Sequence, residues 1–115
     1  MADIEECRAA LEQFSRTMAG AEGDARKAAA LDRTLSCWLT DLDVTFTGTL
    51  RDGRLQGIAH ADGAPGGKAA IRLTMTSDDL VALVDGRLGF AAAWARGRVR
   101  LEAGFQDLLR LRNLL

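Results

Sequence analysis

Several residue types that carry common protein functions are scarce in this chain of 115 residues. The single histidine and the two cysteines, Cys7 and Cys37, include no Cys-x-x-Cys pair, which excludes a zinc site of the usual ligand spacing. In a chain of otherwise ordinary composition we expect the two cysteines to be buried thiols rather than a disulfide. A formal net charge of -1 leaves no basic excess, so no nucleic-acid partner is expected.

Long hydrophobic runs are also missing. No apolar stretch approaches the roughly 20 residues that span a bilayer, so we expect no transmembrane segment. The start of the chain carries Asp3, Glu5 and Glu6 where a signal peptide needs positive charge, which favours a cytoplasmic location. With 48% hydrophobic and 27% charged residues, the chain has the composition of a globular protein, and its length predicts a single domain over residues 1–115.

The first 34 residues predict helices. Residues 3–18 carry apolar side chains at steps of three and four, with Asp3 as the cap. This predicted apolar stripe consists of Ile4, Cys7, Leu11, Phe14 and Met18. Asp24 is placed to cap a second, short helix through residue 33.

From Leu35 onward the apolar period changes to two, which predicts strands. The expected strands are residues 35–40, 44–50, 54–61, 69–76 and 99–103. Asp52-Gly53 predicts a hairpin between the second and third strands. On the third strand, strict alternation places Leu55, Gly57 and Ala59 on the inward face, where small residues leave room opposite Phe46, and turns Ile58 and His60 the other way.

The last third of the chain predicts three helices around the final strand. Ser77 is placed to cap a helix that ends at Gly86, and residues 90–96 form a short helix closed by Gly97. Residues 105–115 predict a closing helix that is apolar over more than one stripe and therefore needs a broad cover. The loop Asp62 to Lys68 lacks the first glycine and the final Ser or Thr of a phosphate-binding loop, so we reject nucleotide binding there.

Residues 71–115 resemble the C-terminal half of the sterol carrier protein type 2 family, a family of small lipid-binding domains. The matching features are the strand Leu73-Thr74-Met75-Thr76 leading into Ser77-Asp78-Asp79-Leu80, then Leu83-Val84-Asp85-Gly86-Arg87-Leu88, Ala93, Gly97-Arg98-Val99-Arg100-Leu101 and Ala103-Gly104, followed by the amphipathic end helix. The chain ends Asn113-Leu114-Leu115, so we expect neither the peroxisomal tripeptide of eukaryotic members nor the enzyme modules often fused to the domain.

The resemblance implies an α/β (α+β) fold, with a five-stranded, mainly antiparallel sheet and helices over one face. An apolar tunnel between sheet and helices would hold a fatty acyl chain, a sterol or a similar lipid, and the C-terminal helix would form part of its wall. No cofactor and no catalytic residue belong to the basic domain. The expected lining residues are Phe46, Leu73, Met75, Phe90, Trp94, Leu101, Phe105, Leu108 and Leu109. We therefore expect a protein that binds, and potentially carries, an apolar small molecule.

Two other functions stay open at the level of sequence. The first is an enzyme, for instance a cyclase or isomerase, that uses the same cavity with Asp41, Asp43, His60 or Cys37 as acid–base groups. The second is an interaction module whose C-terminal helix docks on a partner or on a second copy, which would make a homodimer.

Overall fold

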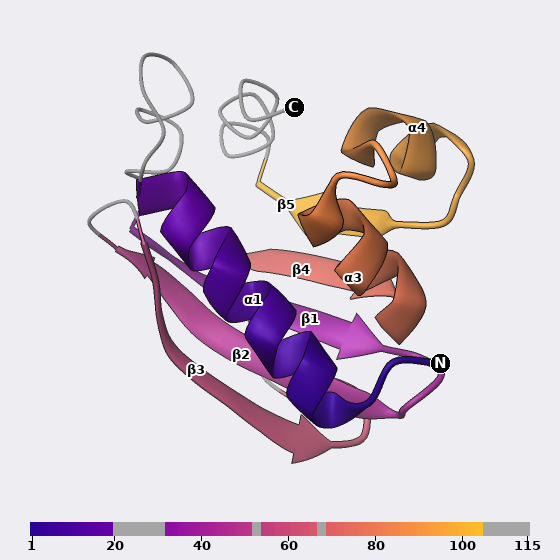
Figure 1. Ribbon diagram of the computed structural model, residues 1–115. Coiled ribbons are helices and arrows are strands. Elements are labelled where there is room, and N and C mark those ends of the chain that lie inside the picture. Colours follow the sequence, from indigo (N-terminus) through magenta and orange to yellow (C-terminus); the bar gives the residue numbers. More distant parts are fainter. Residues whose placement is uncertain (20–31, 52–53, 67–68, 105–115) are drawn as a thin grey trace.

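The computed structural model of the chain has one β-sheet with helices packed over one of its faces (Figure 1). It describes residues 1–19, 32–51, 54–66 and 69–104. Its elements are α1 (Ile4–Ala19), β1 (Arg33–Leu39), β2 (Val44–Arg51), β3 (Arg54–Asp62), β4 (Ile71–Met75), α3 (Ser77–Asp85), α4 (Phe90–Ala95) and β5 (Arg100–Ala103). The predicted final helix lies outside the described residues. So does most of the short helix expected after Asp24, but its predicted last residue, Arg33, is the first residue of β1.

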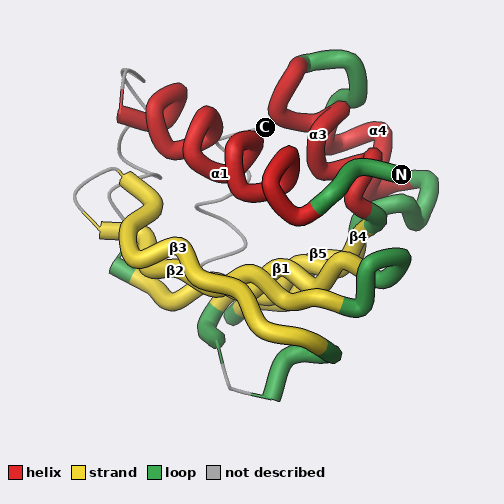
Figure 2. Tube along the Cα trace, turned by 60° about the horizontal axis from the view of Figure 1, so that its bottom comes forward, coloured by secondary structure: helices red, strands yellow, loops and turns green. Residues whose placement is uncertain are grey.

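The strands lie in the order β3-β2-β1-β4-β5. Every neighbouring pair is antiparallel except β1 and β4, which are parallel. Figure 2 shows α1 and α3 on the same side of the sheet. The predicted α+β fold, with a five-stranded, mainly antiparallel sheet and helices over one face, is confirmed.

The parallel pairing of β1 and β4 requires the chain to return along the sheet between β3 and β4. The described parts of this connection, residues 63–66 and 69–70, lie on the face opposite the helices (Figure 2). At one end the Thr45 hydroxyl donates to the carbonyl of Gly63 at 2.7 Å, and at the other the Ala70 amide donates to the Thr34 hydroxyl at 2.9 Å. The connection therefore contacts the threonine-rich face of β1 and β2 at both of its ends. The helices pack on the opposite, apolar face.

The apolar face of the two central strands follows the predicted alternation. Cys37 of β1 pairs with Phe46 of β2, and Leu39 pairs with Val44, and all four side chains are buried. Both cysteines are buried and unpaired with each other, as expected. Because side chains alternate along a strand, these residues share one face and form the floor on which the helices pack.

The predicted facing of β3 is right for Leu55 but wrong beyond Gly57. Leu55 pairs with Leu50 and His60 pairs with Phe46, so both lie on the helix-covered face. The register shifts between Thr47 and Thr49, opposite Gly57, whose φ of 64° is in the left-handed region that favours glycine. This bulge adds one residue to β3 and reverses the alternation, so the inward face carries Leu55, Ile58 and His60 instead of small residues.

The start of α3 also differs from the prediction. The N-cap is Thr76, whose hydroxyl accepts from the Asp79 amide at 3.2 Å. Ser77 is the first helical residue, and its amide and hydroxyl both donate to the carboxylate of Asp41. The other end agrees with the prediction, since Gly86 closes the helix in the left-handed conformation, with φ of 81°.

Candidate functional site

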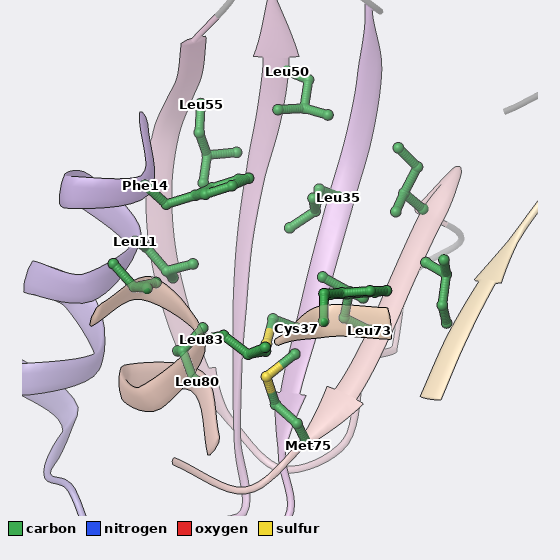
Figure 3. A pocket seen from close by; sticks show the side chains of 14 residues that line it. Leu11, Phe14, Leu35, Cys37, Leu50, Leu55, Leu73, Met75, Leu80 and Leu83 are labelled. Atoms are coloured by element: carbon green, nitrogen blue, oxygen red, sulfur yellow. The ribbon is translucent and has the colours of Figure 1, made fainter. Parts of the chain in front are cut away.

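An apolar cavity of about 270 Å³ lies between the sheet and the helices. Figure 3 shows side chains from both layers converging on it. Its described walls consist of Leu11, Phe14, Leu35, Cys37, Leu50, Leu55, Ile71, Leu73, Met75, Leu80, Leu83, Val84, Phe90 and Leu101.

The cavity exists because two layers of apolar side chains meet over it without filling the space. The sheet supplies its floor from β1 to β5, including Cys37 and Met75. Leu11 and Phe14 of α1 and Leu83 of α3 line the cavity from the helical layer (Figure 3). Protein interiors are normally packed to crystal-like density, so an apolar void of this size is a binding-site candidate.

The described walls carry no charged side chain. The titratable group among them is the Cys37 thiol, and its pKa is raised to about 12, chiefly by burial and then by the neighbouring Cys7. That thiol is therefore protonated near neutral pH. Among the described lining residues, the cavity offers hydrocarbon surface and a neutral thiol, which suits an apolar ligand.

The structure brings together four of the nine residues that the sequence suggested as ligand contacts. Leu73, Met75, Phe90 and Leu101 all face the cavity. Phe105, Leu108 and Leu109 lie outside the described residues.

Phe46 and Trp94 are placed elsewhere. Phe46 is buried on β2 against His60, with their ring centroids 5.3 Å apart, so it belongs to the packed part of the core. Trp94 is 51% exposed at the surface of α4. The i, i+4 spacing put Phe90 and Trp94 on one side of the helix, but only the residue at the helix start reaches the cavity.

None of the cavity residues that α1 and α3 supply was among the lining residues expected from the sequence. Leu11 and Phe14 were on the predicted apolar stripe, and Leu80 and Leu83 belong to the helix predicted to end at Gly86. Their periodicity predicted burial correctly but carries no signal that separates a residue bordering empty space from one in a filled core.

The sequence-level candidates for acid–base chemistry at Asp41, Asp43 and His60 have structural contacts, and the cavity wall described above includes none of them. Burial raises the pKa of Asp41, but the hydrogen bonds from Ser77 and from the backbone of Asp41 and Leu42 together outweigh it, so the pKa is lowered overall. Asp43 adopts a φ of 51° in the turn before β2, a conformation that aspartate tolerates.

His60 lies at the edge of the sheet beneath α1. The Arg8 guanidinium donates to Nδ1 of His60 at 2.7 Å and to the Ile58 carbonyl at 3.3 Å. Because a guanidinium carries only donors, Nδ1 acts as the acceptor. Ser15, further along α1, likewise exchanges hydrogen bonds with the backbone of Leu55. These contacts fasten α1 to both sides of the bulge and hold one wall of the cavity in place.

Comparison with known proteins finds resemblances in structure. No protein-family model matches the chain, and no curated protein matches it. A crystal structure of sterol carrier protein 2 superposes with a TM-score of 0.66 at 20% identity, over 92% of this chain and 87% of that one. The sterol carrier protein domain 2 of Helicoverpa armigera superposes with a TM-score of 0.70 at 13% identity, over 98% and 89% of the two chains. The chain has the sterol carrier protein 2 fold.

The same fold also occurs inside a larger enzyme. The stereoselective inverting sec-alkylsulfatase from Pseudomonas sp. matches with a TM-score of 0.58 at 26% identity. The match covers 90% of this chain but only 16% of the sulfatase, so it concerns one segment of that protein.

None of the described helices of the present chain is long and apolar enough to cross a membrane.

Proposed function

We propose that the protein binds an amphiphile with a single acyl or alkyl chain, and that the chain occupies the cavity between the sheet, α1 and α3. The observation that carries this proposal is the cavity itself, whose described walls are apolar throughout. The sterol carrier protein 2 fold supports a lipid-binding role in general.

The size of the cavity favours one slender chain over a rigid sterol. Its volume of about 270 Å³ is slightly below the roughly 300–1,000 Å³ of sites that enclose drug-sized ligands. Each methylene transferred from water into such a site contributes about 0.8 kcal/mol. A polar head group would remain outside the described walls, because these offer it neither a charge nor a strong hydrogen-bonding partner.

The first experiment is native mass spectrometry of the purified protein, followed by organic extraction of any bound material. An adduct whose extracted mass corresponds to a fatty acid or another single-chain amphiphile is expected. The purified, delipidated protein is then titrated with a fluorescent fatty acid, parinaric acid, and should bind one molecule per chain.

A cavity-filling variant locates the binding site. Leu83→Trp places an indole in the cavity and should weaken parinaric acid binding at least tenfold, because the added volume competes with the ligand. Leu42→Trp is the matched control, since Leu42 is partly buried against the core but is absent from the described cavity wall. Equal affinities for the Leu83→Trp variant and the unmodified protein would refute binding in this cavity.

A further inference from the structure

The outer surface of α4 is apolar although it faces solvent. From Leu88 to Ala95 the chain has no charged side chain and, apart from the indole of Trp94, none with a polar atom. Ala91, Ala92, Trp94 and Ala95 are exposed, whereas Ala93 is buried and anchors the helix in the core. Trp94, at 51% exposure, is one of two large hydrophobic residues exposed in the described part of the chain, the other being Met1.

Arginines flank this apolar surface. Between Gly86 and Leu101 the sequence contains four arginines and no aspartate or glutamate. Arg87 is paired with Asp85, and Arg98 with Asp79. Arg96 and Arg100 are exposed, and within the described residues no carboxylate lies within ion-pair distance of either. The whole chain has a formal net charge of -1, so this positive charge is local.

We propose that α4 and its flanking arginines, from Arg87 to Arg100, form a docking surface for an anionic lipid bilayer. Tryptophan combines an apolar ring with an N–H donor and is favoured at the boundary between lipid and water. Arginines beside an apolar surface are attracted to anionic head groups. The combination of exposed Trp94 with uncompensated Arg96 and Arg100 therefore matches a negatively charged lipid surface in both chemistry and charge.

The position of α4 connects docking with the cavity. Phe90 starts the helix and forms part of the cavity wall, while Trp94 lies one turn further on at the outer surface. A bilayer that contacts Trp94 is then separated from the cavity by this one short helix. Docking would therefore bring the cavity to a source of lipid, and this consequence rests on the proposed function. The docking itself is independent of that function.

Vesicle flotation with delipidated protein tests the docking surface. Vesicles of phosphatidylcholine alone are compared with vesicles that also contain phosphatidylglycerol, at low and at high salt. The protein should bind the anionic vesicles at low salt and lose most of that binding at high salt, because surface charges are screened. Intrinsic fluorescence should shift to shorter wavelength on binding, and the shift should be absent from Trp94→Phe.

Charge variants identify the surface. Arg96→Gln with Arg100→Gln should lower the partition coefficient on anionic vesicles about tenfold or more, since each basic residue contributes substantially near such a surface. The matched control, Arg16→Gln with Arg54→Gln, removes the same charge from exposed positions on α1 and β3 and should lower it less than threefold.

Three results would overturn the proposal. The first is equal binding to neutral and anionic vesicles, and the second is an equal loss of vesicle binding in the two double variants. The third is a concentration-dependent dimer in sedimentation that Trp94→Ala abolishes, which would assign the surface to a second copy. Parinaric acid binding without vesicles is measured on every variant. Absence of this binding in the unmodified protein would count against the proposed function, whereas its retention in a variant that loses vesicle binding isolates the docking surface.

Discussion

Gly57 lies at the bulge that sets which side chains of β3 face the helices. Its positive φ accommodates the bulge that brings both Leu55 and His60 to the helix-covered face. Strict alternation, the rule available from sequence, predicts the opposite facing for His60. A glycine in a strand is compatible with a bulge or with close approach of another chain segment, so the pattern alone does not decide between them.

Gly48 has too little room for a β-carbon. A β-carbon there would lie 2.8 Å from Cδ1 of Leu55 and 3.2 Å from the Gln56 carbonyl oxygen. We expect Gly48→Ala to lower the free energy of unfolding by about 1 kcal/mol and to push Leu55 into the cavity. Chemical denaturation measures the first effect, and weaker parinaric acid binding reports the second.

The control for this substitution is Gly66→Ala. Nothing lies within 4 Å of a β-carbon built on Gly66, so its stability and affinity should stay close to those of the unmodified protein. A Gly48→Ala variant as stable and as tight-binding as the Gly66→Ala variant would contradict the close packing of β2 against β3.

The cavity thiol should be unreactive in the native protein. Burial raises the pKa of Cys37 to about 12 and is also the main cause that raises the pKa of Cys7 to about 11. Because the thiolate is the reactive form, we expect Ellman's reagent at pH 8 to modify both residues more than about 100-fold slower than in the denatured chain. Single Cys7→Ser and Cys37→Ser variants assign each rate, and a fast native reaction would contradict the burial.

At the scale of elements, α3 depends on a contact from outside its own sequence. Asp41, in the turn after β1, accepts hydrogen bonds from the amide and the hydroxyl of Ser77, with its Oδ1 at 2.9 Å from the amide nitrogen. Thr76 supplies the ordinary cap one residue earlier. The helix start is therefore tied to the β1–β2 turn, which fixes Leu80 and Leu83 over the sheet.

This contact gives stability a defined dependence on acid. The pKa of Asp41 is lowered from its ordinary value of 3.8, so the unfolded chain takes up the proton first as the pH falls. Its contribution is fully present well above pH 3.8 and is lost as the pH falls through the lower pKa of the folded state. Asp41→Asn should therefore be less stable than the unmodified protein at pH 7, by about 1 kcal/mol, with a smaller difference below that window.

Denaturant unfolding of both proteins across this pH range measures the difference. Asp43→Asn is the control, because Asp43 lies in the same turn and its carboxylate accepts no hydrogen bond from the described residues. A constant gap between Asp41→Asn and the unmodified protein down to strongly acidic pH would show that the Asp41 carboxylate does not bind Ser77 as described.

At the scale of the whole molecule, ligand binding should raise thermal stability. The empty cavity forfeits contacts among the side chains around it, and a ligand restores them in the folded state alone. At a ligand concentration one hundred times the Kd, stability should increase by about 2.7 kcal/mol, which raises Tm by roughly 10 °C. Thermal unfolding with and without parinaric acid tests this, and Leu83→Trp should show little increase.

Much of the fold follows from local rules that the sequence already satisfies. The alternation in β1, β2 and β4, the amphipathic stripe of α1 and the glycine after α3 each depend on neighbours a few residues away, and each was predictable. The same patterns placed Leu73, Met75, Phe90 and Leu101 on inward positions, and the structure finds all four at the cavity.

Three features were decided only by the tertiary structure. The bulge at Gly57 depends on how β3 pairs with β2, and the contact of Asp41 with Ser77 joins residues 36 apart. The cavity depends on how closely two layers approach, which is set by the sum of many packed side chains rather than by any one of them. The sequence thus determined which residues are buried, whereas the separation of helices and sheet determined which of them face the cavity. The reason is that hydrophobic periodicity reports burial but contains no information on the distance between the two layers.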